Sequence, residues 1–202
     1  MIKHTIFNTP AITACARTVA RIGLWVTGWK AVGQPPQEAQ FVAVGAPHTS
    51  NWDFLLVLVL AFVFKVKPRV LAKNSLFRKP WGPLFRWLAC LPVDRSSPHG
   101  LVGQVVRAFE ENDDLVLGIA PEGTRSRTRK WRTGFYYIAE GAKVPIAVVF
   151  LDYKNKRIGI AFSLTPSGDV DADMERICSF YKGIEGKHPE HSVWAGDEPD
   201  EQ

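Results

Sequence analysis

Short apolar runs alternate along this chain with longer segments whose apolar residues recur at helical spacing. The clearest helical segment is 99–111, where Leu101, Val105 and Phe109 form one apolar row. This alternation predicts an α/β fold with a mixed, largely parallel sheet flanked by helices. The short turn 153–156 between the last two runs predicts a hairpin, and so one antiparallel pair. The runs predicted to be strands are 41–45, 69–72, 91–93, 115–119, 146–151 and 158–162.

Two further segments have apolar patterns that differ from those of the strands: one is apolar throughout, and the other is amphipathic. Segment 54–64 is uncharged and apolar. A membrane-spanning helix needs roughly 20 such residues, and this segment has only about half that number. We expect it to be a buried core helix. Segment 11–30 predicts an amphipathic helix with Arg17 and Arg21 on one side and Trp25 and Trp29 near its end. Such a helix suits a membrane interface, and it equally suits packing on the domain's own core. Its apolar stripe consists of Ile12, Cys15, Val19, Ile22 and Val26.

Composition describes a folded globular chain, with 46% apolar residues in 202. We divide it into an N-terminal amphipathic membrane-contact segment at 1–40, one catalytic domain at 41–190 and an acidic tail at 191–202. The three cysteines are an odd and widely spaced set, which points to a reducing compartment.

The net charge of +5 is unevenly distributed, because four acidic residues lie in the tail. The basic excess suits an anionic partner: a phosphorylated substrate, a membrane surface, the phosphates of coenzyme A or nucleic acid. A solvated basic face is the simpler alternative. The two basic clusters are Lys65, Lys67, Arg69, Lys73, Arg78, Lys79, Arg86 and Arg95, and then Arg125, Arg127, Arg129, Lys130 and Arg132.

Polar side chains follow three of the predicted strands. His48 comes after 41–45, Arg95 after 91–93, and Glu122 after 115–119. Since ligands bind beyond the carboxyl ends of strands in open α/β sheets, these residues are expected to converge on one edge.

His48 and Asp53 form a candidate acid–base pair. Histidine is the side chain whose ordinary pKa suits proton transfer near neutral pH, and a carboxylate can orient its ring. Five positions on an α-helix rotate a side chain by about 140°. His48 is therefore predicted to precede a helix that has Asp53 in its first turns, with Thr49, Ser50 or Asn51 as the cap. The other histidines and the cysteines are scattered, so no metal site is predicted.

His48 to Asp53 reads His-x4-Asp, and residues 121–125 read Pro-Glu-Gly-Thr-Arg. In this order they resemble the glycerolipid acyltransferase family of the lysophosphatidic acid acyltransferase type. The resemblance extends over about 42–149, since 90–95 and 143–146 are similar to two further blocks of that family. It implies that His48 is the base and Asp53 its partner. The acceptor or acyl site implied by the family comprises Arg95, Glu122, Gly123, Thr124, Arg125 and Pro145.

The residue types suit those implied roles. Arg95 and Arg125 each offer a forked donor to phosphate, and Gly123 lets the backbone approach a ligand closely. Thr124 adds a hydroxyl donor. Glu122 would repel phosphate, so it could orient an arginine, bond a glycerol hydroxyl, or form a structural ion pair.

We therefore expect an O-acyltransferase that moves a fatty acyl group from acyl-CoA or acyl carrier protein to a lysolipid, with 1-acylglycerol 3-phosphate as the leading acceptor. Pro47 and Ala120 replace residues common in the family, which leaves other lysolipids open. No cofactor and no nucleic acid partner are expected. The predicted location is peripheral, on the cytoplasmic face of an anionic membrane. Backbone amides at the start of the helix after His48 are the expected oxyanion donors. The alternative function is non-catalytic binding of anionic membranes or nucleic acid.

Overall fold

The computed structural model describes residues 5–78, 80–94, 98–124 and 130–192. Within these ranges a seven-stranded sheet has the order β1-β7-β6-β2-β5-β3-β4. All neighbouring strands are parallel except β6 and β7, which pair antiparallel. The predicted α/β fold with a largely parallel sheet is thus confirmed. The strands are β1 (Lys30–Val32), β2 (Phe41–Ala46), β3 (Pro68–Lys73), β4 (Cys90–Val93), β5 (Val116–Ile119), β6 (Ile146–Asp152) and β7 (Arg157–Leu164).

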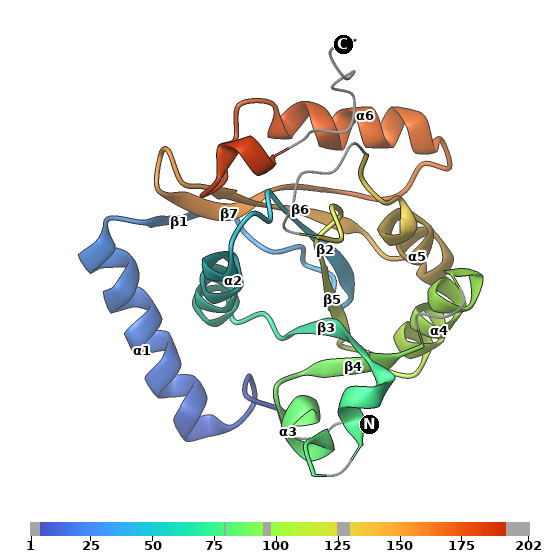
Figure 1. Ribbon diagram of the computed structural model, residues 1–202, viewed down its shortest axis with the longest axis horizontal. Coiled ribbons are helices and arrows are strands. Elements are labelled where there is room, and N and C mark those ends of the chain that lie inside the picture. Colours follow the sequence, from blue (N-terminus) through green and yellow to red (C-terminus); the bar gives the residue numbers. More distant parts are fainter. Residues whose placement is uncertain (1–4, 79, 95–97, 125–129, 193–202) are drawn as a thin grey trace.

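Helices cover both faces of this sheet (Figure 1). Because side chains alternate along a strand, Val42 and Val44 of β2 enter a core formed with α4, α5 and α6. Phe41 faces the opposite way, into a core that includes Leu24 of α1 and Leu60 of α2. The helices are α1 (Pro10–Thr27), α2 (Asn51–Phe64), α3 (Gly82–Trp87), α4 (Pro98–Glu110), α5 (Gly134–Ala142) and α6 (Val170–Tyr181), with short 3-10 turns η1 (Asn74–Phe77) and η2 (Pro189–His191).

Two features differ from the sequence-based expectation. The edge strand β1 was not predicted, because its three residues are too few to show a period of two. The expectation that 54–64 is a buried core helix is wrong for its first half: Leu60 and Phe62 are buried, but Phe54 and Leu55 are about half exposed. An apolar helix has more apolar surface than one sheet face and one neighbouring helix can cover.

Helix α1 packs on α2 through a narrow face that contains Thr13, Ala20 and Leu24. Its apolar stripe points outward instead, with Val19 and Val26 more than 60% exposed. The helix ends at Gly28, whose φ of 74° is a left-handed conformation that glycine adopts readily. No helix among the described residues combines the length and the apolar character needed to cross a membrane.

Candidate active site

The loop between β2 and α2 carries His48 at the carboxyl edge of the sheet. Its Nδ1 lies 3.3 Å from Oδ2 of Asp53. The carboxylate is almost fully buried, at 1% exposure, whereas the His48 side chain is 29% exposed. The ring therefore presents Nδ1 to a buried carboxylate, while the side chain as a whole remains partly exposed.

The spacing of the two residues follows from how α2 begins. Ser50 is the N-cap, and its hydroxyl accepts a hydrogen bond from the Trp52 backbone N–H. Asp53 is the third residue of the helix, and its Oδ2 accepts from the backbone N–H groups of Ser50 and Thr49, both at 2.7 Å. This is a capping box, in which a helix-start carboxylate satisfies backbone donors that the helix leaves unpaired. Asp53 thus starts the helix and faces His48 with one side chain.

Tyr153, in the turn between β6 and β7, supplies the remaining contact to Asp53. Its hydroxyl donates to Oδ1 at 2.7 Å. Burial acts to raise the pKa of Asp53, but hydrogen bonds from His48, Tyr153, Ser50 and Thr49 outweigh it, so that the pKa lies below its ordinary value. The carboxylate is therefore charged at neutral pH and can stabilise a protonated imidazole.

Glu122 approaches the same loop from the turn after β5. Its Oε1 accepts a hydrogen bond from the His48 backbone N–H at 3.0 Å, and the residue is 7% exposed. Its Oε2 is buried and has no hydrogen-bond partner among the described residues. Burial raises the pKa of this carboxyl above its ordinary value. Glu122 therefore holds the His48 backbone; its predicted contact with an acceptor stays a prediction.

A pocket of about 920 Å³ opens beside His48. Apolar side chains from β3, α4, β5 and α5 form most of its lining, including Leu71, Leu101, Val102, Ile119, Phe135 and Ile138. The volume falls in the range of roughly 300–1,000 Å³ usual for small-molecule sites, and an apolar lining with few polar groups is usual too. His48 thus borders a space with mostly apolar walls.

Polar groups of this pocket come from the turn after β5 and from the start of α5. Gly123, Thr124 and Arg132 all line it. Gly123 has a φ of 67°, and a Cβ there would lie only 2.9 Å from Nε of Arg132. A glycine is therefore required for the arginine to pack as it does. Arg132 was not predicted as a site residue, since in the sequence it is one of several neighbouring basic residues.

The remaining predicted residues are placed differently. Arg95 and Arg125 lie outside the described residues. Pro145 directly precedes β6, and its carbonyl accepts from Val42 near the start of β2. Since β2 and β6 are parallel, Pro145 lies at the opposite edge of the sheet from His48, so the structure does not bring it to this pocket.

Several backbone amides of the His48 loop and one at the start of α2 are engaged within the protein. Those of Thr49 and Ser50 donate to Asp53, and that of Trp52 donates to the Ser50 hydroxyl. The His48 amide donates to Glu122. These four groups organise the loop, and the expectation that amides at the start of α2 bind an oxyanion stays a prediction.

A family described as Acyltransferase matches residues 33–151, which is more than half of the chain. The chain belongs to the acyltransferase family. A search of curated proteins found no match. The matched region includes β2, α2, β5 and α5, and so contains His48, Asp53 and every lining residue of the pocket named above. The acyltransferase requires two substrates, an acyl donor and an acceptor.

Proposed function

We propose that this acyltransferase moves a fatty acyl group from acyl-CoA or acyl carrier protein to the hydroxyl of a lysolipid, in phospholipid biosynthesis. 1-Acylglycerol 3-phosphate is the acceptor that the residues favour. The observation that carries this proposal is a buried, charged Asp53 behind a partly exposed His48 that borders an apolar pocket. That arrangement joins a general base to a space suited to a fatty chain.

In the proposed reaction, Nδ1–H of His48 donates to Asp53 and Nε2 accepts the proton of the acceptor hydroxyl. The alcohol oxygen forms a bond to the thioester carbonyl carbon, giving a tetrahedral intermediate. The intermediate collapses as the carbon–sulfur bond breaks. The imidazolium returns its proton to the leaving thiolate, so that the products are an ester and a free thiol. Asp53 stays charged throughout.

The acceptor headgroup would lie at the polar end of the pocket. Thr124 offers a hydroxyl there and Arg132 a guanidinium, whose fork matches two phosphate oxygens. The described residues include no ion-pair partner for Arg132. Arg95 and Arg125, which the family resemblance implies for the same role, would add to this set. A phosphorylated acceptor therefore fits better than a neutral one.

The acyl chain would occupy the apolar part of the pocket. Leu101 and Val102 of α4 and Phe135 and Ile138 of α5 line this part. Burying each methylene of a chain among such residues is worth about 0.8 kcal/mol. No cofactor enters this scheme, because the donor thioester already supplies an activated acyl group.

The proposal is tested by assaying purified enzyme with acyl-CoA and acyl carrier protein donors over a panel of lysolipids. We expect transfer to 1-acylglycerol 3-phosphate to exceed transfer to neutral lysolipids. Folded His48→Ala protein should lose activity by at least about a thousandfold, as loss of a catalytic base does. Arg132→Lys keeps the charge but loses the fork, and it should raise the acceptor KM more than the donor KM. An inactive wild type that still binds anionic vesicles would favour the non-catalytic alternative.

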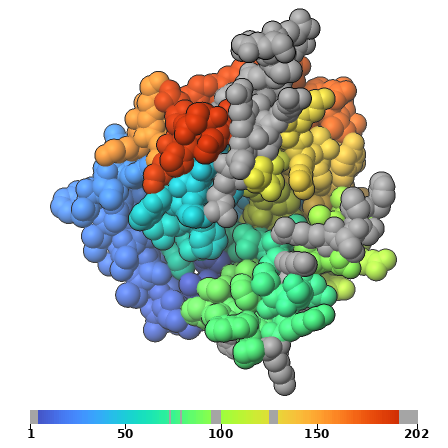
Figure 2. All heavy atoms as spheres, in the orientation of Figure 1, coloured from blue at the N-terminus to red at the C-terminus, as the bar shows by residue number. Residues whose placement is uncertain are grey.

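We propose further that the enzyme binds the membrane peripherally, on its cytoplasmic face. Exposed apolar side chains gather on neighbouring elements: Ile22, Trp25 and Val26 on α1, and Trp52 and Phe54 at the start of α2. These two helices lie side by side on the face seen in Figure 2, in blue and cyan. Trp25 is 82% exposed, and so high an exposure is unusual for a large apolar ring on the surface of a globular protein. Such residues suit an interface between headgroups and acyl chains.

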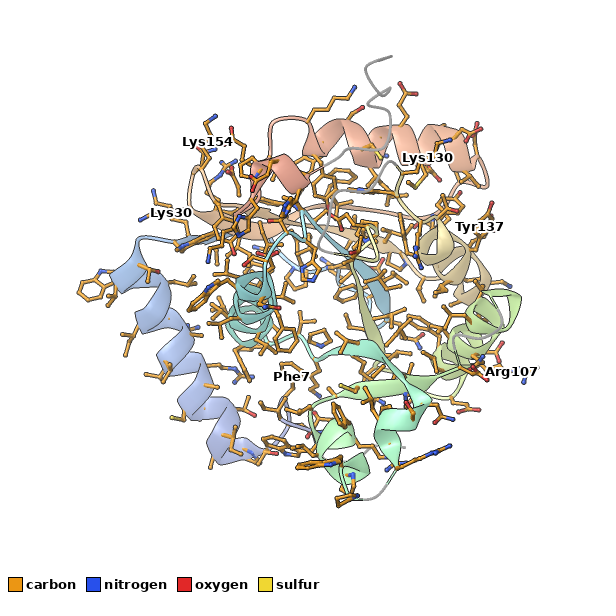
Figure 3. The ribbon with its side chains drawn as sticks, viewed as in Figure 1. Phe7, Lys30, Arg107, Lys130, Tyr137 and Lys154 are labelled. Carbon is orange, nitrogen blue, oxygen red and sulfur yellow. The ribbon has the colours of Figure 1, made fainter. Side chains whose placement is uncertain are left out.

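Trp29 does not share this exposure, because it packs edge-on against Tyr153 with ring centroids 5.0 Å apart. The informative variant is therefore Trp25→Ser, with Tyr137→Ser as the matched control. Tyr137 is also an exposed aromatic residue, on α5, and Figure 3 shows it far from α1. Trp25→Ser should weaken sedimentation with anionic vesicles, and salt should weaken wild-type binding. Equal binding by both variants and wild type would refute attachment through α1.

A further inference from the structure

Asp53 is held by more than the segment that contains the His-x4-Asp motif. Its Oδ2 is occupied by two backbone N–H groups at 2.7 Å and by the His48 ring. Its Oδ1 accepts from the Tyr153 hydroxyl at 2.7 Å. A carboxylate is planar, so fixing Oδ1 from the far side sets the direction in which Oδ2 presents its lone pairs to His48.

Tyr153 lies beyond the region that matches the family, which ends at residue 151. It is nevertheless held firmly: its ring meets the Trp29 ring edge-on, and its backbone N–H donates to the Glu185 carbonyl at 2.9 Å. Burial and the neighbouring Asp53 raise the pKa of Tyr153 above its ordinary value. The phenol therefore stays protonated at neutral pH and acts as a donor.

The segment that binds the Tyr153 backbone also contacts the loop that carries His48. The His188 backbone N–H donates to the Thr49 hydroxyl at 3.2 Å. Gly186 packs so closely that a Cβ would lie 2.8 Å from the Thr49 hydroxyl and 3.0 Å from the Pro47 ring. Residues 185–188 thus connect Tyr153 on one side with the loop before α2 on the other.

We propose that Tyr153 is a positioning residue for acyl transfer: it fixes the Asp53 carboxylate against His48, and residues 185–188 lock Tyr153 to the His48 loop. The inference rests on the proposed function of His48 as base. Tyr153 does not line the substrate pocket and is not a catalytic residue itself. Its effect on the reaction passes through Asp53 alone.

The test is Tyr153→Phe, which keeps the ring against Trp29 and removes only the hydroxyl. Loss of a hydrogen bond to a charged group should lower kcat by about tenfold or more, with both substrate KM values within about twofold of wild type. The matched control is Tyr137→Phe, which removes an exposed hydroxyl on α5 and should leave kcat unchanged. Unchanged kcat in Tyr153→Phe, or a loss explained by a smaller folded fraction, would overturn the proposal.

A second measurement does not depend on activity. The His48 Nδ1–H proton should give a downfield NMR resonance in wild type, because it donates to a buried carboxylate. Tyr153→Phe should shift or broaden this resonance. Gly186→Ala should do the same, because the added methyl group would displace the Thr49 side chain in the His48 loop. Tyr137→Phe should not. An unperturbed resonance in Tyr153→Phe would refute the positioning role. If wild type transfers no acyl group but the resonance moves, the proposed function fails while the positioning of Asp53 stands.

Discussion

The two walls of the candidate active site are held together in different ways. The base wall, made of the His48 loop, Asp53, Tyr153 and Glu122, is held by short polar contacts, some local and some between elements far apart in the chain. The pocket wall is held by apolar packing of α4 and α5 on the sheet, and near His48 its only described polar side chains are those of Thr124 and Arg132. Directional bonds fix an angle, whereas apolar packing fixes a volume.

Because the two walls are held differently, we expect their variants to affect different kinetic properties. In the proposed mechanism, a small change in the direction of the His48 ring would alter proton transfer, so variants in the base wall should act mainly on kcat. In the proposed complex, the pocket wall would contact the fatty acyl chain over a large area without directional bonds, so its variants should change which substrate is preferred. Single substitutions can therefore alter one wall while leaving the other intact.

The largest effect is expected from Asp53→Asn. An amide stabilises imidazolium poorly and can favour the wrong tautomer of His48, so kcat should fall by roughly 10³–10⁴-fold. The matched control is Asp173→Asn, which also changes a buried carboxylate that accepts hydrogen bonds, here from Tyr136 and Ser167. That control should lower the melting temperature but keep kcat per folded molecule. Comparable kcat losses in both variants would mean that stability alone explains the effect.

An intermediate effect is expected from filling the pocket wall at Gly134. This glycine lines the pocket, and a Cβ there would meet nothing within 4 Å. Gly134→Leu should shorten the space by about two methylenes, which reduces the kcat/KM ratio of palmitoyl-CoA to octanoyl-CoA by roughly tenfold. Gly103→Leu on α4 is the control, since that glycine is equally unobstructed but does not line the pocket. An unchanged ratio in Gly134→Leu would place the acyl chain elsewhere.

The central part of the base wall, His48 and Asp53 with the helix start between them, was largely predictable from sequence. The His48–Asp53 spacing excludes two positions on one helix face, and the cap residue between them predicts where α2 begins; the structure places Ser50 there. His48 and Glu122 each follow a predicted parallel strand, which also predicted that they lie near each other. Tyr153 could not be predicted, because it is 100 residues from Asp53 and reaches it only through the β6–β7 hairpin. A lone tyrosine beside a turn carries no local signal of such a contact.

The pocket wall was harder to predict. Apolar periodicity in 99–111 predicts a helix that packs on the sheet, but it does not reveal that residues of α4 and α5 line a pocket together with residues of β3 and β5. Pro145 is a second example of a position that local sequence could not predict. A short motif can resemble a family block, but which edge of the sheet it occupies depends on strand direction. Local patterns predict elements, and tertiary packing decides which of them share a pocket.

The smallest effect is expected from Glu122→Gln, which tests to which wall Glu122 belongs. The amide oxygen can still accept from the His48 backbone N–H, so kcat should stay within a few-fold of wild type. A raised pKa means that the folded state binds its proton more tightly than the unfolded state does. Glu122 therefore destabilises the fold increasingly as pH rises through the unfolded pKa of about 4.3 towards the folded pKa, and the full penalty is present above both.

Removing that charge should stabilise the neutral-pH fold by roughly 1 kcal/mol, because an amide costs less to bury than a carboxylate, and for a chain of this length that is about 2–4 °C in Tm. The Tm difference from wild type should shrink as pH falls towards about 4. Glu140→Gln, at an exposed carboxylate on α5, is the control and should show a smaller change at every pH. A higher acceptor KM in Glu122→Gln with no gain in Tm would assign Glu122 to substrate binding, and so to the pocket wall.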